Sequence, residues 1–282
     1  MSATLAGRTI VMSGGSRGIG LAIAEKAARD GANVALLAKT DEPHPKLEGT
    51  IHTAAAAIEA AGGNALPVVG DVRDEESVTA FIDRAAAEFG GIDVVVNNAS
   101  AIDLSPSEEL AMKRYDLMQE INTRGTFLLT RTAIGHLRAS DHGHILTLSP
   151  PLDLRPKWFG PNLGYALAKY GMSLCTVGFA EELRDDGVAA NSLWPRTLIS
   201  TAAVRNLLGG DDSIARSRTP QIVADAAYAI LARDPRACTG NHFIDDDVLR
   251  EEGVTDFAPY RTDPSSEGLA LDLFVDRDLG DA

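Results

Sequence analysis

A tyrosine and a lysine stand four residues apart in the stretch Tyr165-Ala166-Leu167-Ala168-Lys169. In a helix, residues at this spacing lie over the same face, so the Lys169 ammonium is expected beside the Tyr165 phenol. A free tyrosine titrates near pH ~10, and a neighbouring positive charge favours the phenolate. Alone, the spacing is also typical of an exposed helix pair. In a suitable context it predicts a proton donor and acceptor that works near neutral pH.

A glycine-rich loop near the N-terminus has the sequence Ser-Gly-Gly-Ser-Arg-Gly-Ile-Gly. It follows an apolar run and opens a helical stretch, so its backbone N–H groups and the helix N-terminus can meet a pyrophosphate. Strand, loop, helix and second strand also follow in the order that dinucleotide binding requires. The residues expected at the nucleotide are Ser13, Gly14, Ser16, Arg17, Gly18, Ile19 and Gly20.

The end of the second expected strand indicates which dinucleotide is bound. A site that selects NAD usually places an acid there to bond the ribose hydroxyls, whereas this chain has Ala38-Lys39. Lys39, joined by Arg17, offers cations where the 2′-phosphate of NADP would lie, and Ala38 removes a repelling carboxylate. We therefore expect NADP. NAD is the alternative, because Asp41 and Glu42 are close by.

Short β-rich runs alternate with long alanine-rich helical stretches along the chain. This alternation is typical of a parallel sheet covered by helices on both faces. The expected strands are 9–12, 33–37, 65–69, 93–96, 144–148, 189–193 and 241–244. The expected helices are 18–30, 50–61, 75–89, 108–137, 163–185, 201–208 and 221–233. The pattern predicts an α/β fold, a Rossmann-type doubly wound sheet of seven parallel strands with helices on both faces.

Length and composition favour one large domain, because 282 residues with 45% hydrophobic content can bury one substantial core. We assign residues 1–244 to an NADP-binding domain and residues 245–282 to an acidic C-terminal extension. The extension retains the apolar anchors Phe257, Tyr260, Leu273 and Phe274. We expect it to pack on the same domain or on a neighbouring subunit, with disorder as the alternative for so acidic a segment. A further irregular segment is expected at 40–49, where prolines interrupt the path.

The chain is acidic, with a formal charge of -14 and a pI near 4.8. Nucleic acid and anionic membranes attract basic surfaces, so neither is expected as a partner. Residues 1–5 lack the basic and apolar regions of a signal peptide, which favours the cytoplasm. Cys175 and Cys238 are too few for a disulfide framework, so both are expected to be reduced and structural.

With these residues in place, nearly the whole sequence resembles the short-chain dehydrogenase/reductase family. The motifs follow in family order: the glycine-rich loop, an aspartate that contacts the adenine, an Asn-Asn-Ala strand end, a helix asparagine that supports the catalytic lysine through water, and the tyrosine–lysine pair. The matching positions outside the loop and the pair are Asp71-Val72, Asn97-Asn98-Ala99, Asn122, and Pro195 near the nicotinamide.

The resemblance implies an oxidoreductase that interconverts an alcohol and a carbonyl on a small molecule. Tyr165 would exchange a proton with the substrate oxygen, Lys169 would lower the pKa of the tyrosine and bond the nicotinamide ribose, and the cofactor would carry the hydride. The resemblance also implies a homodimer or homotetramer joined through the helices around 108–137 and 163–185.

Within that family, several stretches are similar to the hydroxysteroid dehydrogenase-like protein 2 group. They are Ala38-Lys39-Thr40 leading to 43–47, Ser149-Pro150-Pro151-Leu152, 168–173, and 193–195 with 201–203. Eukaryotic members of the group carry an additional C-terminal sterol-carrier-like domain, for which this chain leaves no room. The lipid-carrier role of that domain is therefore not expected here.

Two positions depart from the family pattern. Where the family carries a serine that bonds the substrate oxygen, this chain has Leu152, and Ser149 stands further from the tyrosine. Either Ser149 takes over the role or the serine is missing, and we favour Ser149. Arg196 stands where the family has glycine. It is expected either to face a phosphate or an acidic substrate, or to be a solvated loop arginine.

The substrate is expected to be apolar or lipid-like. The residues that could wall such a pocket are Trp158, Phe159, Trp194 and Leu198, although residues of these types are also ordinary core. A metal site is not expected, because His142 and His144 beside Asp141 have no further ligands at metal spacing.

Two other functions compete with this one. The displaced serine and the following prolines are compatible with a nucleotide-bound regulatory or binding protein whose catalysis is weakened. An NAD-linked dehydrogenase that works in the oxidative direction is the third possibility.

Overall fold

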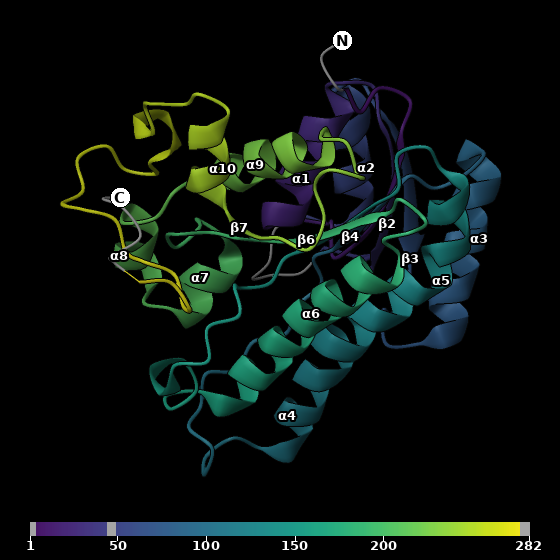
Figure 1. The fold of residues 1–282 in the computed structure, drawn as a ribbon. Coiled ribbons are helices and arrows are strands. Elements are labelled where there is room, and N and C mark those ends of the chain that lie inside the picture. Colours follow the sequence, from purple (N-terminus) through teal and green to yellow (C-terminus); the bar gives the residue numbers. More distant parts are fainter. Residues whose placement is uncertain (1–3, 44–48, 277–282) are drawn as a thin grey trace.

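A computed structural model describes residues 4–43 and 49–276. These residues form a sheet of seven strands, all parallel, in the order β3-β2-β1-β4-β5-β6-β7 (Figure 1). The strands are β1 (Thr9–Ser13), β2 (Asn33–Ala38), β3 (Asn64–Val69), β4 (Val94–Asn97), β5 (His144–Thr147), β6 (Ala189–Trp194) and β7 (His242–Ile244). The predicted doubly wound α/β fold is confirmed, and every strand end lies within one residue of its expected position.

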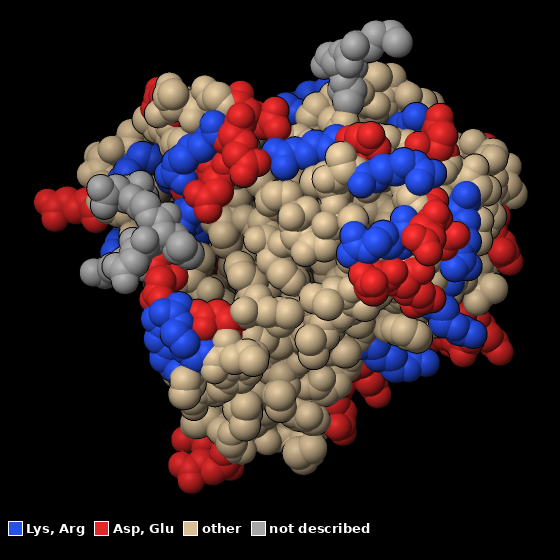
Figure 2. All heavy atoms as spheres, in the orientation of Figure 1, with Lys and Arg blue, Asp and Glu red and all other residues tan. Residues whose placement is uncertain are grey.

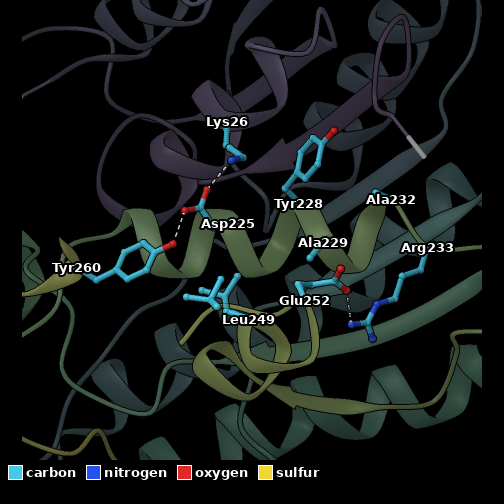
Figure 3. A pocket seen from close by; sticks show the side chains of 10 residues that line it. Lys26, Asp225, Tyr228, Ala229, Ala232, Arg233, Leu249, Glu252 and Tyr260 are labelled. Atoms are coloured by element: carbon cyan, nitrogen blue, oxygen red, sulfur yellow. Dashed lines mark hydrogen bonds and ion pairs between the residues drawn. The ribbon is translucent and has the colours of Figure 1, made fainter. Parts of the chain in front are cut away.

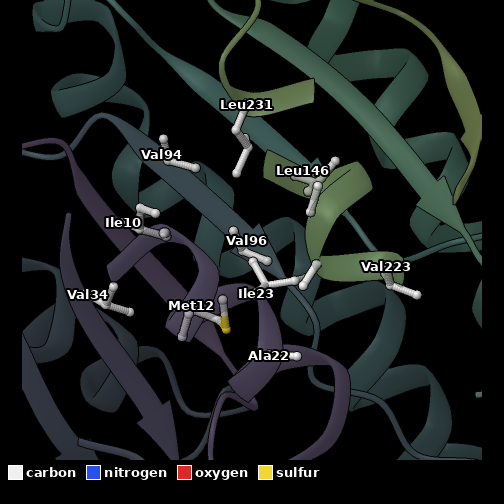
Figure 4. Packing of buried hydrophobic residues seen from close by; sticks show 14 of the residues in the cluster. Ile10, Met12, Ala22, Ile23, Val34, Val94, Val96, Leu146, Val223 and Leu231 are labelled. Atoms are coloured by element: carbon white, nitrogen blue, oxygen red, sulfur yellow. The ribbon is translucent and has the colours of Figure 1, made fainter. Parts of the chain in front are cut away.

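Alternating side chains of the central strands bury two separate cores on opposite faces of the sheet. Ile10 and Met12 of β1 belong to the core in Figure 4, whereas Val11 belongs to the core on the other face. The helices on the first face are α1 (Gly18–Ala28), α2 (Ile51–Ala60) and α9 (Gln221–Leu231). Those on the second face are α3 (Glu75–Phe89), α5 (Gly125–Ala139) and α6 (Leu163–Glu182).

The prediction of one continuous helix over 108–137 is wrong. The structure divides it into α4 (Met112–Met118), a π-helical turn (Gln119–Arg124) and α5. The wider turn carries Asn122, whose amide bonds the backbone of Ala101 on the neighbouring strand end. A hydrophobic pattern with helical spacing continues through such a turn, so the pattern does not reveal it.

Three short helices complete the C-terminal part: α7 (Ala202–Leu207), α8 (Gly210–Ala215) and α10 (Asp245–Glu251). The sequence did not predict α8 or α10. Three aspartates open α10, and negative charge at a helix N-terminus is favourable. After α10 the chain returns to the end of β6, where Leu271 forms an antiparallel bridge with Thr197. Of the irregular segment expected at 40–49, residues 44–48 lie outside the described residues.

The carboxyl ends of the strands form one edge, and the chain order reverses there between β1 and β4. Ser13 pairs in register with Leu37 on one side and with Asn97 on the other, and Asn97 pairs with Thr147. Ligands of such sheets bind in the crevice at this reversal.

Candidate active site

The glycine-rich loop lies directly against the end of β4. A Cβ added at Gly14 would lie 2.8 Å from the Ala99 Cα, and one at Gly20 would lie 2.5 Å from the Asn98 Nδ2. The Asn98 Nδ2 donates to the Gly14 carbonyl at 2.8 Å, and the Ser13 Oγ accepts the backbone N–H groups of Asn98 and Ala99. These contacts fix the loop at the chain reversal, and they require glycine at both positions.

The N-terminus of α1 faces this edge and fits an anionic group. Gly18 begins the helix with a φ of 58°, in the left-handed region that glycine adopts readily. In the described part of the chain no side chain caps this end, and its first turn contains no acid. Its backbone donors therefore suit the pyrophosphate of a dinucleotide. Ser16 is buried, the Arg17 Nη2 donates to the Gly49 carbonyl at 2.7 Å, and Ile19 packs on the core.

Lys39, expected to meet a 2′-phosphate, forms an ion pair with Asp71 at 2.8 Å. The Arg73 Nη2 bonds the same carboxylate at 2.8 Å. Although burial works in the opposite direction, hydrogen bonds from Arg73 and Lys39 hold the pKa of Asp71 well below its usual range. Val72, next to Asp71, is buried against α5. The two expected nucleotide residues Lys39 and Asp71 thus contact each other.

Tyr165 and Lys169 lie together on the first half of α6, and both are buried. The Lys169 Nζ donates to the carbonyl of Leu148, just beyond β5, at 2.9 Å, and lies 5.1 Å from the centre of the Trp194 ring. Burial lowers the pKa of Lys169 to about 7, while the negative charge of Asp272 opposes that shift. The amine is thereby held at the carboxyl edge of the sheet.

Tyr165 does not have the lowered pKa that the sequence led us to expect. Burial raises the pKa of its phenol, and the charge of Asp272 acts in the same direction. A hydrogen bond with the Ser100 hydroxyl opposes the rise. Lys169 bonds a backbone carbonyl instead, so its charge does not offset the loss of solvent around the phenol.

Sequence reasoning missed both Ser100 and Asp272. Ser100 follows Asn98-Ala99, at the place where the family motif Asn-Asn-Ala-Gly has its glycine. This departure from the motif could have identified Ser100 as a candidate site residue. Asp272 lies in the acidic extension and carries no motif; although the residue keeps some exposure, its carboxyl group is enclosed, and this raises its pKa to about 7.

Asn122 clamps the backbone next to Ser100. Its Oδ1 accepts the Ala101 N–H at 2.7 Å, and its Nδ2 donates to the Ala101 carbonyl at 3.0 Å. The π-helical turn points this amide at the end of β4, so Asn122 fixes the strand end that presents Ser100 to Tyr165.

Ser149, the expected substitute serine, is completely buried. Its Oγ has no hydrogen-bond partner within the residues that the structure describes. The adjacent Pro150 carbonyl accepts a hydrogen bond from the Ser173 Oγ at 2.6 Å, which holds this stretch against α6. Pro195, directly after β6, is also buried.

Aromatic side chains surround Tyr165, and Phe274 of the C-terminal extension lies among them. The Phe274 ring centre lies 6.1 Å from that of Tyr165, 5.5 Å from Tyr170, 6.1 Å from Trp194 and 6.3 Å from Trp158. Phe159 packs on Tyr170 at 4.8 Å. Leu198 does not join this group; it packs with Val204 and Ile214 in a separate cluster.

Arg196 neither faces solvent nor points to an open anion site. It is completely buried, with its Nε 2.6 Å from the Asp246 Oδ1 and its Nη2 2.6 Å from the Asp247 Oδ1. Arg218, also buried, pairs with the other Asp246 oxygen at 3.1 Å. The Asp245 Oδ1 accepts the Arg196 N–H, and burial raises the pKa of this carboxyl to about 7. These side chains fasten α10 to the end of β6.

The two histidines considered for a metal have other partners. The His142 Nε2 lies 2.7 Å from the Leu231 carbonyl, and the His144 Nε2 lies 3.1 Å from the Arg233 carbonyl. Burial lowers the pKa of His144 to about 3, so this ring is neutral at physiological pH.

A surface hollow of about 440 Å³ lies away from these residues, between α1, α9 and α10 (Figure 3). Its charged side chains bond within the hollow: Lys26 and Tyr260 contact Asp225, and Arg233 contacts Glu252. It contains none of the expected site residues. Among the described helices, none combines the length and apolar character needed to cross a bilayer.

Relatives of known sequence match almost the whole chain. Hydroxysteroid dehydrogenase-like protein 2 of Xenopus tropicalis is 53% identical over 272 residues, which are 96% of this chain and 64% of that protein. The chain therefore spans 64% of that relative's length. The predicted resemblance to this group is confirmed.

Solved structures agree with the fold. A short-chain dehydrogenase of Mycobacterium thermoresistibile is 57% identical with a TM-score of 0.91, covering 97% of this chain and 96% of that one. A proposed dehydrogenase of Xanthomonas campestris is 50% identical with a TM-score of 0.94, covering 97% and 99%. A metagenomic short-chain oxidoreductase in complex with NADP is 26% identical with a TM-score of 0.70, covering 85% and 97%.

The family model of short-chain dehydrogenases matches residues 8–209, from the start of the first strand to the loop after α7. This range contains the glycine-rich loop, the Asn98 strand end, Asn122 and the Tyr165–Lys169 pair. On the match of the family model and the identity of its relatives, the chain belongs to the short-chain dehydrogenase family.

Proposed function

We propose that this protein is an NADP-dependent oxidoreductase that interconverts an alcohol and a carbonyl on an apolar or lipid-like small molecule. The observation that carries the proposal is the position of Tyr165 and Lys169. They lie at the same edge of the sheet as the glycine-rich loop, with the lysine bonded to the end of β5. A proton donor and a hydride carrier can meet there.

The nucleotide would be held by the loop from Ser13 to Gly20, the strand end at Asn98 and Ala99, Val72, and Pro195. A bound nicotinamide would supply the hydride at its C4 atom. Tyr165 would donate a proton to the substrate oxygen during reduction and remove it during oxidation. Lys169 would leave the Leu148 carbonyl for the ribose hydroxyls, and Asn122 would position the strand end between them.

NADP is favoured over NAD by the side chains at the end of β2. Lys39 keeps 60% of its side chain exposed and pairs only across the surface with Asp71, so a 2′-phosphate can compete for the ammonium. Among the structural neighbours, one is in complex with NADP and another of similar identity is in complex with NAD, so the choice rests on Lys39. Titration of the purified protein with NADPH and NADH, read by nucleotide fluorescence, tests it. Equal affinities would favour the NAD-linked dehydrogenase.

Two serines compete for the hydroxyl that bonds the substrate oxygen. Ser149 keeps its place in the proposal because its buried Oγ lacks a partner in the described residues and lies beyond the end of β5. Ser100 is favoured by a different observation, its hydrogen bond to the Tyr165 phenol. Ser100→Ala and Ser149→Ala, compared for kcat, identify the serine that acts in the reaction. Circular dichroism checks whether either variant has lost structure.

An apolar substrate is supported by the aromatic side chains around Tyr165. Trp158, Tyr170 and Trp194 present large apolar faces within one cluster with the phenol, and such surfaces bind apolar groups. We also propose the cytoplasm as the location, which agrees with the free thiols of Cys175 and Cys238.

A homodimer or homotetramer is proposed for the assembly. The outer faces of α5 and α6 carry apolar side chains that are 43–59% exposed: Phe127, Leu167, Leu174 and Val177. The surface over α4 and α6 is largely free of charge (Figure 2). Exposed apolar patches of this kind mark protein contacts. Light scattering measures the mass in solution, and a strict monomer would contradict the proposal.

The regulatory alternative shares tight nucleotide binding but not turnover. The experiment that separates the two is a screen of carbonyl compounds with NADPH, followed by absorbance, on the wild type and on Tyr165→Phe. The enzyme predicts turnover in the wild type that falls by about 10²–10⁴-fold in the variant, with unchanged NADPH affinity. Tight NADPH binding without turnover on any carbonyl would favour the regulator.

A further inference from the structure

The last described segment, residues 270–276, crosses the site that contains Tyr165. Three hydrogen bonds attach its first part to the end of β6 and to the stretch after it. The Leu198 N–H donates to the Ala270 carbonyl at 2.9 Å, and the Asp272 N–H donates to the Arg196 carbonyl at 3.0 Å. The Trp194 indole donates to the Leu273 carbonyl at 2.8 Å. This part of the segment is firmly held.

Phe274 fills the aromatic cluster beyond this attachment. Its side chain is only 4% exposed, and it meets Tyr170 and Trp194 edge to face, a favourable arrangement of aromatic rings. Its φ is 67°, a left-handed backbone conformation that is unfavourable for a bulky residue. The packing of the ring therefore holds the backbone in a conformation that it would otherwise leave.

The end of the segment, after the buried Val275, carries surface ion pairs. Asp276 pairs with the Arg155 Nη2 at 2.6 Å and also with Lys157. Both cations belong to the loop before α6, and about half of each side chain is exposed. Exposed ion pairs contribute little to stability, so this attachment opens far more easily than the buried pairs of Arg196.

The segment packs beside the buried phenol of Tyr165. Tyr165 is 5% exposed with Phe274 in place. A proton donor must come within hydrogen-bond distance of the substrate oxygen, so a substrate needs room beside the enclosed Tyr165 ring, whose centre lies 6.1 Å from that of Phe274. The Asp272 carboxylate adds a negative charge that disfavours the phenolate. The structure thus has the proposed proton donor enclosed and protonated.

We propose that residues 270–276 form a gate, and that Phe274 is a plug which the substrate displaces from between Trp158, Tyr170 and Trp194. This inference rests on the function proposed for Tyr165 and narrows its substrate class. The substrate carries a flat apolar group beside the reacting carbon, because that group takes the place of a phenyl ring.

The gate can be tested without turnover, because the chain has two tryptophans, and both contact Phe274. Acrylamide quenching of their fluorescence is measured in the unliganded protein. Phe274→Ala is expected to raise quenching most. Asp276→Asn, which removes only the charge of the outer attachment, is expected to raise the open fraction by about two- to fivefold. Asp186→Asn, which removes the distant ion pair to Arg138, is the control and matches the wild type.

Unchanged quenching in both gate variants would overturn the gate. If Phe274→Ala does not fold, Asp276→Asn decides alone, since it retains every apolar contact. Raised quenching in a protein that reduces no carbonyl would support the gate while contradicting the proposed function, so the two failures are distinguishable.

Kinetics with acetophenone and acetone test the plug. A phenyl ring that replaces Phe274 gains the burial of an apolar side chain, so acetophenone is expected to exceed acetone in kcat/KM by roughly 10- to 100-fold. Asp276→Asn is expected to lower the KM for acetophenone by about two- to fivefold with kcat and NADPH affinity unchanged. Equal kcat/KM for the two ketones would overturn the substrate class, and an unchanged KM would contradict the gate.

Discussion

The two halves of the crevice at the carboxyl edge are built in different ways. The nucleotide half is centred on one short segment, the loop between β1 and α1, and hydrogen bonds between backbone groups and the uncharged side chains of Ser13 and Asn98 attach this loop to the end of β4. The substrate half joins three segments that are far apart in sequence, around 150–161, 194–218 and 245–276, and side chains hold them together. The first half is therefore general to a dinucleotide, whereas the second is particular to this chain.

The difference is also one of electrostatics. The helix end at the glycine-rich loop offers backbone donors without a buried charge. The substrate half buries Arg196, Arg218, Asp245 and Asp246 completely. Buried ions are costly unless all of them are paired. The substrate half should thus respond strongly to the loss of one charge, and the nucleotide half to the addition of one carbon atom.

Removing a buried charge should produce the largest effect. Arg196→Met removes the 2.6 Å partner of Asp246 but leaves Arg218 at 3.1 Å, so the cost lies at the lower end of the range for breaking a buried pair, about 3 kcal/mol. Urea unfolding measures the change in the free energy of unfolding. Arg138→Met, which breaks the surface pair with Asp186, is the control and should cost less than about 1 kcal/mol. Similar values for both variants would mean that the buried cluster does not hold the substrate half.

Adding a methyl group to the glycine-rich loop should produce the second-largest effect, in the nucleotide half. In Gly20→Ala the new Cβ would lie 2.5 Å from the Asn98 Nδ2 and 2.8 Å from the Gly14 carbonyl. Relieving such overlap costs about 1–3 kcal/mol, so NADPH affinity should fall by roughly 5- to 150-fold. Gly135→Ala on α5, where the new atom meets nothing within 4 Å, should leave the affinity unchanged. Fluorescence titration measures both, and equal affinities would contradict the proposed position of the pyrophosphate.

Lys39→Ala should have a smaller and selective effect. Losing one exposed charge-assisted bond to the 2′-phosphate costs on the order of 1.4 kcal/mol, so the dissociation constant for NADPH should rise about tenfold. NADH, which lacks that phosphate, should bind the variant as it binds the wild type. If NADPH binding does not change, the NADP preference is wrong.

The last effect is a pH dependence of stability in the substrate half, which is expected over a limited pH window. The pKa of Asp272 is raised to about 7 by burial and by Asp245, against the attraction of Lys169. The protonated carboxyl group contributes to the free energy of unfolding. This contribution is fully present below the pKa that the group has in the unfolded chain, near ~4, and it is lost as pH rises to about 7. Asp272→Asn, which has no proton to lose, should therefore gain stability relative to the wild type over this window. Urea unfolding at pH 5 and pH 8 measures the difference in the free energy of unfolding between the variant and the wild type. This difference should be the same at both pH values if the carboxyl group titrates normally.

The nucleotide half could be predicted from the sequence because its signals are local. The strands appear as short apolar runs, and their predicted ends differ from the structure by one residue at most. The glycine-rich loop can be recognised because its residues, and the strand and helix on either side of it, follow each other within a few positions. Local patterns also located Tyr165 and Lys169 on one helix.

The substrate half could not be predicted because its determinants are distant in sequence. Arg196 meets its partners in α10, about 50 residues later, and no pattern links them. The aspartates of α10 resemble a solvated acidic tail, yet Asp245 and Asp246 are buried. The π-helical turn at Asn122 interrupts no hydrophobic pattern. The enclosure of Tyr165 depends on Phe274, whose place follows from packing alone.

Transfer of deuterium from NADPH labelled at C4 to a carbonyl compound tests the central claim most directly. The product is analysed by mass spectrometry for the wild type and for Tyr165→Phe at saturating cofactor. Proton transfer by Tyr165 beside a bound nicotinamide predicts deuterium on the carbinol carbon in the wild-type product, and about 10²–10⁴-fold less product with the variant. Equal labelled product from both proteins, or no label from a wild type that binds NADPH, would contradict the account.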